Sequence, residues 1–480
     1  MPNQLTARKR SGKPLPFLSA ITICMLCSPW LAFGLCFPLA NLSIDAVQQP
    51  QQKESKKRRP NLILIMADDL GFESLGCNGG RDYATPNLDR LAAEGMRFTQ
   101  CYSNPVCTPS RVQIMTGRYS HRNYQGFGYL DLKERTFAQA LRSANYRTGI
   151  AGKWQLSGTQ ETIEHFGFEQ HLLWNMHAYR PDHAHGSAGE PASWKQRYFS
   201  PTLYRDGKWF AYGSDRYGPD LCTEFLIRFA KKHAEEPFLL YYPMILTHDP
   251  FIAAPDSKLQ DPELLQPRFA SMVFYMDFLV GRILEELDRL GLAEQTLVLF
   301  TADNGSHRSI STDTTFGRIR GGKSLPLVRG MRVPLIARWP GKIAAGSVCE
   351  DLIDFSDFFP TLLEAAEVSL AEDWALDGRS FLPRLLGRPY QPREWIFCHY
   401  WHRGRDAERV TEFVQTKRWK LHADGTLYDL KADPDEQKAM KAEDQETVEI
   451  RNQLQKALNQ VRHPVAVSTQ TTATPEPDKL

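Results

Sequence analysis

The chain has 480 residues, of which 42% are hydrophobic and 24% are charged, and its formal net charge is +2 at pH 7. These fractions are those of an ordinary globular protein, and the length is sufficient for a large domain together with a smaller one. The small net charge argues against nucleic acid, or any strongly acidic surface, as a partner.

Residues 1–46 have the pattern of an export signal. Four basic residues between Arg8 and Lys13 precede an uncharged, largely apolar run from Pro14 to Leu42. This order predicts a cleaved secretory signal peptide, but the run is also long enough to be an uncleaved signal anchor. Both interpretations predict an exported protein (periplasmic, secreted or lumenal), which is membrane-anchored if the segment is not cleaved. Residues 47–60 are polar and basic and are predicted to be a linker.

After this linker, the patterns of buried strands alternate with those of amphipathic helices. Continuous apolar runs, as in strands buried on both faces, occur at Asn61–Ala67, Arg147–Ala151, Phe238–Leu246, Thr296–Thr301 and Pro334–Ala337. Helical spacing occurs at Asn87–Glu94, Thr136–Ala144, Pro219–Ala234, Ser271–Leu290 and Asp357–Ala366. This alternation predicts an α/β domain over residues 61–385, with a mostly parallel sheet flanked by helices. Residues 175–214, rich in His, Gly, Pro and Trp, are predicted to be an insertion.

A second, smaller domain is predicted over residues 386–463. The composition turns to Gly, Pro and charge near residues 372–391. Four short strand-like segments and a charged helix then follow, at Trp395–Trp401, Arg409–Gln415, Trp419–His422, Thr426–Leu430 and Ala442–Arg462. They predict an antiparallel sheet with a terminal helix, and residues 464–480 are predicted to be a disordered tail.

The cysteines give no disulfide framework. Nine are present, three of them in the N-terminal segment, and the other six contain no CxxC pair.

One of the six, Cys107, begins a segment typical of a helix that starts at an anion-binding position. Thr108 is predicted to cap this helix and Gly117 to end it, so that Cys107 lies just outside its N-terminus. Arg111, one turn later, would bind the same anion. A buried structural cysteine before an ordinary helix is the alternative.

The segment from Ser103 to Arg111 contains Cys-x-Pro-x-Arg and resembles the signature of the type I sulfatases, which belong to the alkaline-phosphatase-like superfamily. Other segments similar to that family occur in the expected order between about Pro60 and Leu430. The resemblance implies an alkaline-phosphatase-like fold and hydrolysis of aryl or carbohydrate sulfate esters. It also implies that a formylglycine-generating enzyme converts Cys107 to formylglycine, whose hydrated aldehyde attacks the ester.

Hard oxygen ligands follow two of the predicted strands. Asp68 and Asp69 come directly after the first strand, and Asp303 and Asn304 follow the strand at 296–301. In open α/β sheets, ligands bind beyond the carboxyl ends of strands, and oxygen ligands without Cys–His spacing favour Ca²⁺ or Mg²⁺ over zinc. The resemblance implies that these four residues bind one divalent cation, usually Ca²⁺, which also contacts residue 107.

Three further segments resemble substrate-binding positions of the family. Lys153 ends a predicted strand, His248 follows another, and Lys323 belongs to a Gly-Gly-Lys segment. The resemblance implies that Arg111, Lys153 and Lys323 contact the sulfate group. The resemblance also implies that His248 protonates the leaving alcohol. Histidine suits this role because its side chain titrates near neutral pH.

The sequence departs from the family pattern in two places. Gln155 stands where the family usually has histidine, and glutamine takes up no proton at neutral pH. His121 and Asp303 are candidate substitutes, and the sequence does not decide between them. The acidic residue common in the last block is absent from Ser324–Gly330. His183 and His185 have metal-like spacing, but no second pair accompanies them.

Two other functions are open at this point. A phosphomonoesterase or phosphodiesterase of the same superfamily generally uses Ser or Thr as nucleophile and two metal ions, which disagrees with Cys107 and a single cation site. A catalytically impaired, exported binding protein is suggested by the departures at Gln155 and at residues 328–329. The sequence predicts neither the natural substrate, its exo or endo cleavage, nor the oligomeric state.

Overall fold

The computed structural model describes residues 58–174, 176, 196–255, 257–259, 261–369, 374–401, 410–441 and 444–462. The predicted signal segment, the His183–His185 pair and the predicted tail lie outside these residues. The chain from Lys57 onward forms one compact unit. Within the described ranges, every helix is too short or too polar to cross a membrane.

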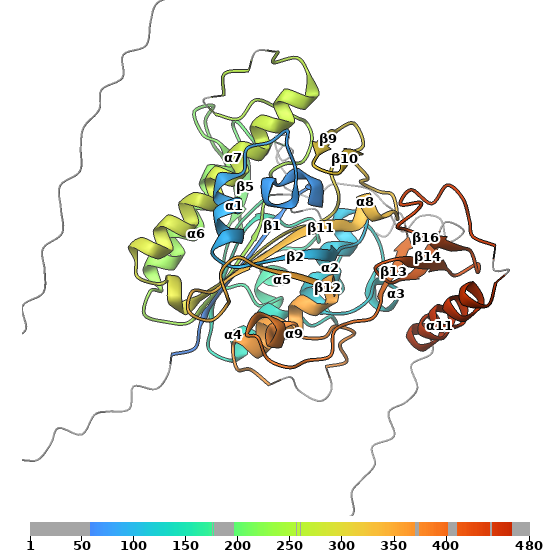
Figure 1. Ribbon diagram of the computed structural model, residues 1–480. Coiled ribbons are helices and arrows are strands. Elements are labelled where there is room, and N and C mark those ends of the chain that lie inside the picture. The colour runs from blue at the N-terminus through green and yellow to red at the C-terminus, as the bar shows by residue number, and fades with distance from the viewer. Residues whose placement is uncertain are drawn as a thin grey trace, which may run out of the picture. The chain divides into compact units, whose positions relative to one another are not determined.

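A ten-stranded sheet forms the centre of this unit (Figure 1). Its strands lie in the order β12 (Ser347–Asp354), β2 (Met96–Tyr102), β11 (Arg332–Arg338), β8 (Thr296–Ala302), β1 (Asn61–Ala67), β7 (Phe238–Pro243), β3 (Arg147–Lys153), β4 (Gln170–Trp174), β5 (Thr202–Arg205) and β6 (Lys208–Ala211). The strands from β8 to β4 are parallel, as predicted. The run at Pro334–Ala337 lies in β11, which is antiparallel to both of its neighbours. Two short strands of the predicted insertion, β5 and β6, extend the sheet instead of standing apart from it.

Helices cover both faces of the sheet, as the sequence predicts. Figure 1 shows α6 (Gly218–Lys232), α7 (Leu265–Arg289) and α1 (Pro86–Ala93) on one side, and α4 (Phe137–Ser143) and α9 (Phe358–Ala365) on the other. The shorter helices are η1 (Phe72–Ser74), η2 (Gly76–Asn78), α2 (Cys107–Thr116), α3 (Ser120–Asn123), α5 (Gln160–His165), η3 (Ala293–Gln295), α8 (Val328–Met331), η4 (Phe355–Asp357) and α10 (Leu382–Leu385). All seven residues of β1 and of β8 are buried, because both faces of these central strands are covered.

A separate four-stranded sheet follows near the C-terminus. Its strands β13 (Ile396–Trp401), β14 (Val410–Gln415), β15 (Trp419–His422) and β16 (Leu427–Asp429) pair in sequence order and are all antiparallel. The terminal helix α11 (Gln445–Arg462) packs on this sheet through Leu454 and Leu458. The predicted fold class, a mostly parallel large sheet with a small antiparallel one, is therefore confirmed. The division near residue 385 stays a prediction.

Arg393 lies in the segment that precedes β13. Its side chain connects this segment to the rest of the unit by polar contacts. Its side chain donates to Tyr119 Oη at 2.7 Å and forms a two-nitrogen ion pair with the buried Asp357. We expect Arg393→Ala to lower the free energy of unfolding by about 3–5 kcal/mol, because it leaves a buried carboxylate without its partner. Denaturant titration measures this loss. The exposed Arg388→Ala is the control, expected to change stability by less than about 0.5 kcal/mol. Equal losses in both variants would contradict the prediction.

Candidate functional site

The carboxyl ends of four neighbouring strands bring most of the predicted site residues together. Asp68 and Asp69 follow β1, Lys153 ends β3, and Asp303 with Asn304 follows β8. His248 lies beyond β7, on a buried loop that continues past Pro243. Backbone hydrogen bonds hold the extensions in register, from Asp68 N–H to the Leu246 carbonyl at 2.8 Å and from Asp303 N–H to the Ala67 carbonyl at 3.0 Å. Parallel pairing therefore collects residues that are more than 200 positions apart in the sequence.

Cys107 reaches the same place from the start of α2, and here the sequence prediction was wrong in one detail. The helix begins at Cys107 itself, with Val106 as the N-cap residue, and it ends at Gly117 as predicted. Thr108 does not cap it, because the Thr108 hydroxyl accepts a hydrogen bond from the Gly128 N–H at 3.1 Å. All ten residues of α2 are buried, so the helix is a fixed support for the cysteine.

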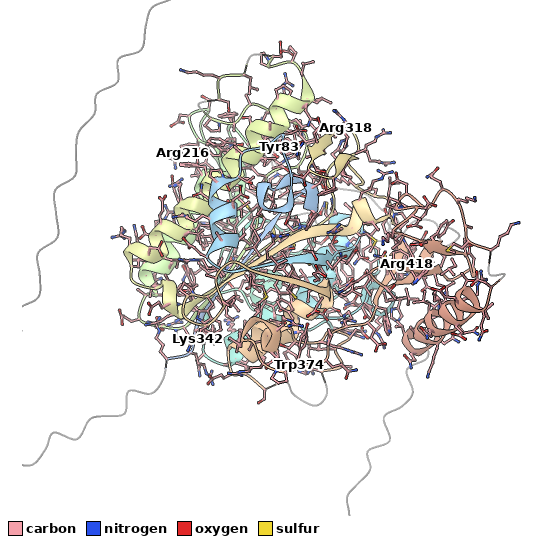
Figure 2. The ribbon with its side chains drawn as sticks, viewed as in Figure 1. Tyr83, Arg216, Arg318, Lys342, Trp374 and Arg418 are labelled. Carbon is pink, nitrogen blue, oxygen red and sulfur yellow. The ribbon has the colours of Figure 1, made fainter. Side chains whose placement is uncertain are left out.

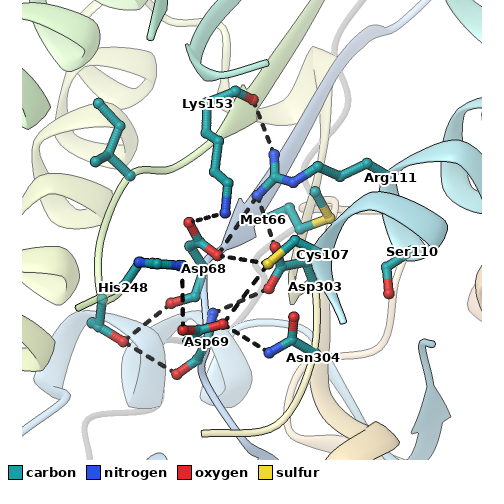
Figure 3. A network of polar contacts seen from close by, with 12 residues as sticks. Met66, Asp68, Asp69, Cys107, Ser110, Arg111, Lys153, His248, Asp303 and Asn304 are labelled. Carbon is teal, nitrogen blue, oxygen red and sulfur yellow. Dashed lines mark hydrogen bonds and ion pairs between the residues drawn. The ribbon is translucent and has the colours of Figure 1, made fainter. Parts of the chain in front are cut away.

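Figure 3 shows how closely these side chains converge. The Cys107 Sγ lies 3.6 Å from Asp68 Oδ1 and 4.0 Å from Asp69 Oδ1. Each carboxylate also contacts a cationic group, with Lys153 Nζ 2.7 Å from Asp68, Lys323 Nζ 2.5 Å from Asp69 and Arg111 Nη2 2.8 Å from Asp303. The nine residues predicted for the site are therefore all in one cluster, in which Asn304 Nδ2 donates to Asp69 Oδ1 at 2.9 Å and Lys323 Nζ is 3.0 Å from His248 Nε2.

Burial and opposite charge set the protonation of these groups. Burial alone would raise the pKa of Asp68, but Lys153 and the other nearby positive charges outweigh it and hold the pKa well below its usual range. Burial and the charge of Asp68 raise the pKa of Asp303 to about 7. The pKa of the Cys107 thiol is also raised, mainly by burial. An unmodified Cys107 is therefore a protonated thiol and a poor nucleophile.

The donor set fits a hard divalent cation. Ligand atoms of Asp68, Asp69, Cys107 and His248 all lie within 4.8 Å of one another. The Asn304 Oδ1 is buried beside them and has no hydrogen-bond partner among the described residues. Three carboxylates face three cationic side chains here, so the formal charges cancel. A cation on the carboxylates would leave the cationic side chains free to bind an anion, and oxygen-rich ligands suit Ca²⁺ or Mg²⁺.

The surroundings of His248 include a residue that sequence reasoning missed. The Nδ1 of His248 lies 2.7 Å from the Asp249 carbonyl, which can only accept, and Nε2 lies 3.0 Å from the Lys323 ammonium, which can only donate. These two contacts favour a proton on Nδ1, although the Arg197 guanidinium, which also only donates, approaches the same nitrogen. Arg197 Nη2 lies 3.2 Å from this Nδ1, and the Arg197 guanidinium stacks on Trp174 with 4.5 Å between its Cζ and the ring centroid. A lone arginine inside an insertion forms no recognisable motif, so no sequence pattern pointed to Arg197.

The structure also separates the two substitutes considered for the missing histidine. His121 packs on Phe397 of the small sheet, and burial lowers its pKa to about 4. Asp303, in contrast, belongs to the cluster through its ion pair with Arg111. Gln155 lies two residues beyond Lys153 in a left-handed conformation (φ 56°), and its buried Oε1 has no partner in the described part of the chain.

Comparison with known proteins identifies the family. The family profile described as Sulfatase matches residues 60–368, which is more than half of the chain and includes every residue of the cluster. The chain belongs to the sulfatase family. A second profile, described as the C-terminal part of N-sulphoglucosamine sulphohydrolase, matches residues 323–464 of this sulfatase, which include the small sheet and α11.

Curated relatives and solved structures agree with this assignment. The sulfatase is 34% identical to human arylsulfatase A over 408 residues, with 78% of each chain covered. It is 31% identical to mouse N-acetylgalactosamine-6-sulfatase, with 82% of this chain and 78% of the relative covered. The structure of Ps i-CgsB in complex with k-i-k-neocarrahexaose superposes with a TM-score of 0.68 at 25% identity and covers 84% of this chain and 92% of that one. The protein is therefore an arylsulfatase-like sulfuric ester hydrolase of alkaline-phosphatase-like fold.

Proposed function

We propose that this sulfatase hydrolyses aryl or carbohydrate sulfate esters through a formylglycine made from Cys107, with one divalent cation as cofactor. The observation that carries the proposal is the position of Cys107 at the start of a buried helix, 3.6 Å from Asp68 and beside Lys153 and Arg111. Maturation requires an oxidising partner, a formylglycine-generating enzyme. Once hydrated, the aldehyde would supply a hydroxyl that accepts the sulfuryl group and a second hydroxyl through which sulfate is expelled.

The cation would be held by Asp68, Asp69, Asp303 and Asn304, with residue 107 as a further ligand. When bound, it would stabilise negative charge on a sulfate oxygen and on the attacking hydroxyl. Arg111 is held at 2.9 Å by the Lys153 carbonyl and at 2.8 Å by Asp303, so its guanidinium is fixed in orientation. Arg111, Lys153 and Lys323 would together bind the sulfate oxygens, because three fixed cationic groups in a buried site stabilise charge that develops during transfer.

The departing alcohol needs a proton, and the Lys323–His248 pair is placed to supply it. The free nitrogen of His248, Nε2, lies 3.0 Å from Lys323 Nζ, so a proton can pass between these two groups. Burial lowers the pKa of His248, while the charges of Asp69 and Asp68 oppose this shift. In the absence of a histidine at position 155, we assign the removal of a proton from residue 107 to Asp303, because Asp303 lies in the cluster beside Arg111, whereas His121 packs on the small sheet.

The wider arrangement of the protein follows from the same proposal. Residues 1–46 would direct export, 47–60 would form a linker, 61–385 the catalytic domain, and 386–463 a C-terminal domain.

The cluster accounts for one cation only, which opposes the two-metal phosphatase alternative within the described ranges. The paired charges and the fixed helix α2 also oppose an impaired binding protein, since the departures at Gln155 and at residues 328–329 leave all nine predicted site residues together in the cluster.

Turnover of 4-nitrophenyl sulfate against 4-nitrophenyl phosphate tests this function. We expect kcat/KM for the sulfate to exceed that for the phosphate by at least about 100-fold, because the described residues form one cation site, whereas phosphatases of this superfamily generally use two metal ions. The matured wild-type protein is used for both esters at equal metal concentration. Faster hydrolysis of the phosphate would refute the proposal in favour of a phosphatase.

Removal of the cation is expected to destabilise the protein as well as inactivate it. Chelation should lower Tm by about 5–10 °C, and added Ca²⁺ should restore it, because a ligand that binds only the folded state stabilises that state. Thermal unfolding with and without Ca²⁺ measures the shift. The variant Asp69→Asn should lose this response, whereas the exposed Asp313→Asn should keep it. An unchanged Tm on chelation of the wild type would contradict the cation assignment.

A further inference from the structure

A second pocket, of about 550 Å³, lies beside the cluster and is lined by four arginines. It is formed by η1, the hairpin of β9 (Ser311–Thr314) and β10 (Gly317–Arg320), helix α8 and residues 434–435. Figure 2 labels Arg318 on this hairpin. The basic side chains are those of Arg318, Arg320, Arg329 and Arg332. The volume is within the usual range for small-molecule sites.

Two of these arginines form no ion pair with any residue that the structure describes. Arg318 pairs with Asp313 at 3.3 Å and Arg329 with Asp435 at 2.6 Å. Arg320 and Arg332, by contrast, use only Nε, which donates to the Arg308 and Thr99 carbonyls, and neither has a carboxylate within 4 Å in the described part of the chain. Their terminal nitrogens therefore remain available to an anion.

The half-buried Arg332 makes this arrangement unusual. Its guanidinium lies 3.9 Å from the centre of the Phe72 ring, and burial lowers its pKa. A charge held partly out of water without an ion partner is unfavourable unless a ligand supplies one. Glu73 also lines the pocket, but it is only 4% exposed, its Oε1 accepts a hydrogen bond from Ser306, burial raises its pKa, and it forms no ion pair with Arg332.

The pocket and the cluster are built on the same two short segments. Phe72 lies three residues after Asp69, and Arg320 lies three residues before Lys323. The Cα atoms of residues three apart are separated by at most about 11 Å. Ser306 links the two segments, because its Oγ contacts Glu73 and its carbonyl accepts the Lys323 N–H at 3.0 Å. An extended substrate can therefore reach both places.

We propose that this pocket binds a second anionic group, a sulfate or carboxylate on another sugar unit of a sulfated oligosaccharide whose ester lies at Cys107. The inference rests on the proposed function and narrows its substrate class from any sulfate ester to polyanionic glycans. Arg320 and Arg332 bind the anion, and Phe316, 56% exposed at the rim of the pocket, offers an apolar face to the sugar ring.

Calorimetric binding of heparin-derived disaccharide and hexasaccharide tests the proposal, in a Cys107→Ala background that does not turn the ligands over. We expect the hexasaccharide to bind this protein about 10- to 100-fold more tightly than the disaccharide, and this gain to disappear in Arg320→Gln/Arg332→Gln. The matched control Arg228→Gln/Arg289→Gln removes the same charge from exposed positions on α6 and α7 and should keep the gain. If the double variant does not fold, the exposed Arg320→Gln alone should weaken binding of the hexasaccharide by about tenfold.

Kinetics with a small ester separate this inference from the proposed function. With Cys107 retained and matured, Arg320→Gln/Arg332→Gln should hydrolyse 4-nitrophenyl sulfate with kcat and KM within about twofold of wild type, because neither arginine contacts the cluster. If the double variant still binds the hexasaccharide more tightly than the disaccharide by the wild-type ratio, the second anion site is refuted, even when aryl sulfate hydrolysis is normal. An inactive wild-type enzyme would instead refute the proposed function, while the binding experiment would still decide about the pocket.

Discussion

Replacement of Cys107 by alanine is expected to abolish sulfate ester hydrolysis, with kcat reduced by at least about 10⁴-fold. The reason is chemical, because alanine has no atom that can be oxidised to the aldehyde or accept the sulfuryl group, and loss of a nucleophile is the largest single effect in covalent catalysis. The fold should survive, since the polar contacts of the Sγ among the described residues are two long ones, at 3.6 and 4.0 Å, to Asp68 and Asp69. We expect a loss of stability of about 1 kcal/mol.

Steady-state hydrolysis of 4-nitrophenyl sulfate, together with denaturant unfolding, measures both expectations. Cys222→Ala is the matched control, because Cys222 is also fully buried, in α6, and lies outside the cluster. This control should lose a similar amount of stability and keep its activity. Mass spectrometry of the Cys107 peptide adds a second readout, since active preparations should contain the aldehyde and unmodified ones should be inactive. Turnover by Cys107→Ala, or by protein with an intact thiol, would refute the role of residue 107.

The parts of the site that could be predicted are those placed by strand ends. Asp68, Asp69, Lys153 and Asp303 each follow or end a run of buried apolar residues, and parallel neighbours in a sheet bring such ends together. The roles expected of them came from resemblance to the family, because carboxylates after a strand are by themselves common. The order of the strands and the antiparallel direction of β11 were beyond the sequence, since they depend on contacts between distant segments.

The features that the sequence did not predict each have a physical cause. Strand β2 was not predicted because three of its seven residues are only partly buried and polar side chains such as Thr99 and Gln100 interrupt its apolar pattern. The start of α2 was misplaced by two residues because the Thr108 hydroxyl bonds the distant Gly128 backbone instead of its own helix. Arg197 was missed because its relation to His248 depends on how the chain returns from the insertion, which no local pattern encodes.

Replacement of His248 by alanine is expected to affect substrates according to the basicity of their leaving group. A sugar alkoxide is a strong base and must be protonated as it leaves, so loss of the proton donor should reduce kcat/KM for a sulfated sugar by about 10²–10⁴-fold. The 4-nitrophenolate ion is a weak base that departs without a proton, so kcat/KM for 4-nitrophenyl sulfate should fall by about tenfold or less. Comparing the two substrates therefore distinguishes proton donation from general damage to the site.

The geometry around His248 gives this prediction a sharp control. Because Nδ1 is held by the Asp249 carbonyl at 2.7 Å, the nitrogen that titrates is Nε2, which lies 3.0 Å from Lys323 Nζ and 3.8 Å from Asp69 Oδ2. Lys323→Ala should lose activity with both esters, because Lys323 also binds the sulfate group, and it should lose more with the sugar ester. The double variant should be little worse than Lys323→Ala, since the two residues act on one proton. The exposed His165→Ala should match wild type with both esters. Equal losses with sugar and aryl esters in His248→Ala would show that His248 positions the sulfate group instead of protonating the alcohol.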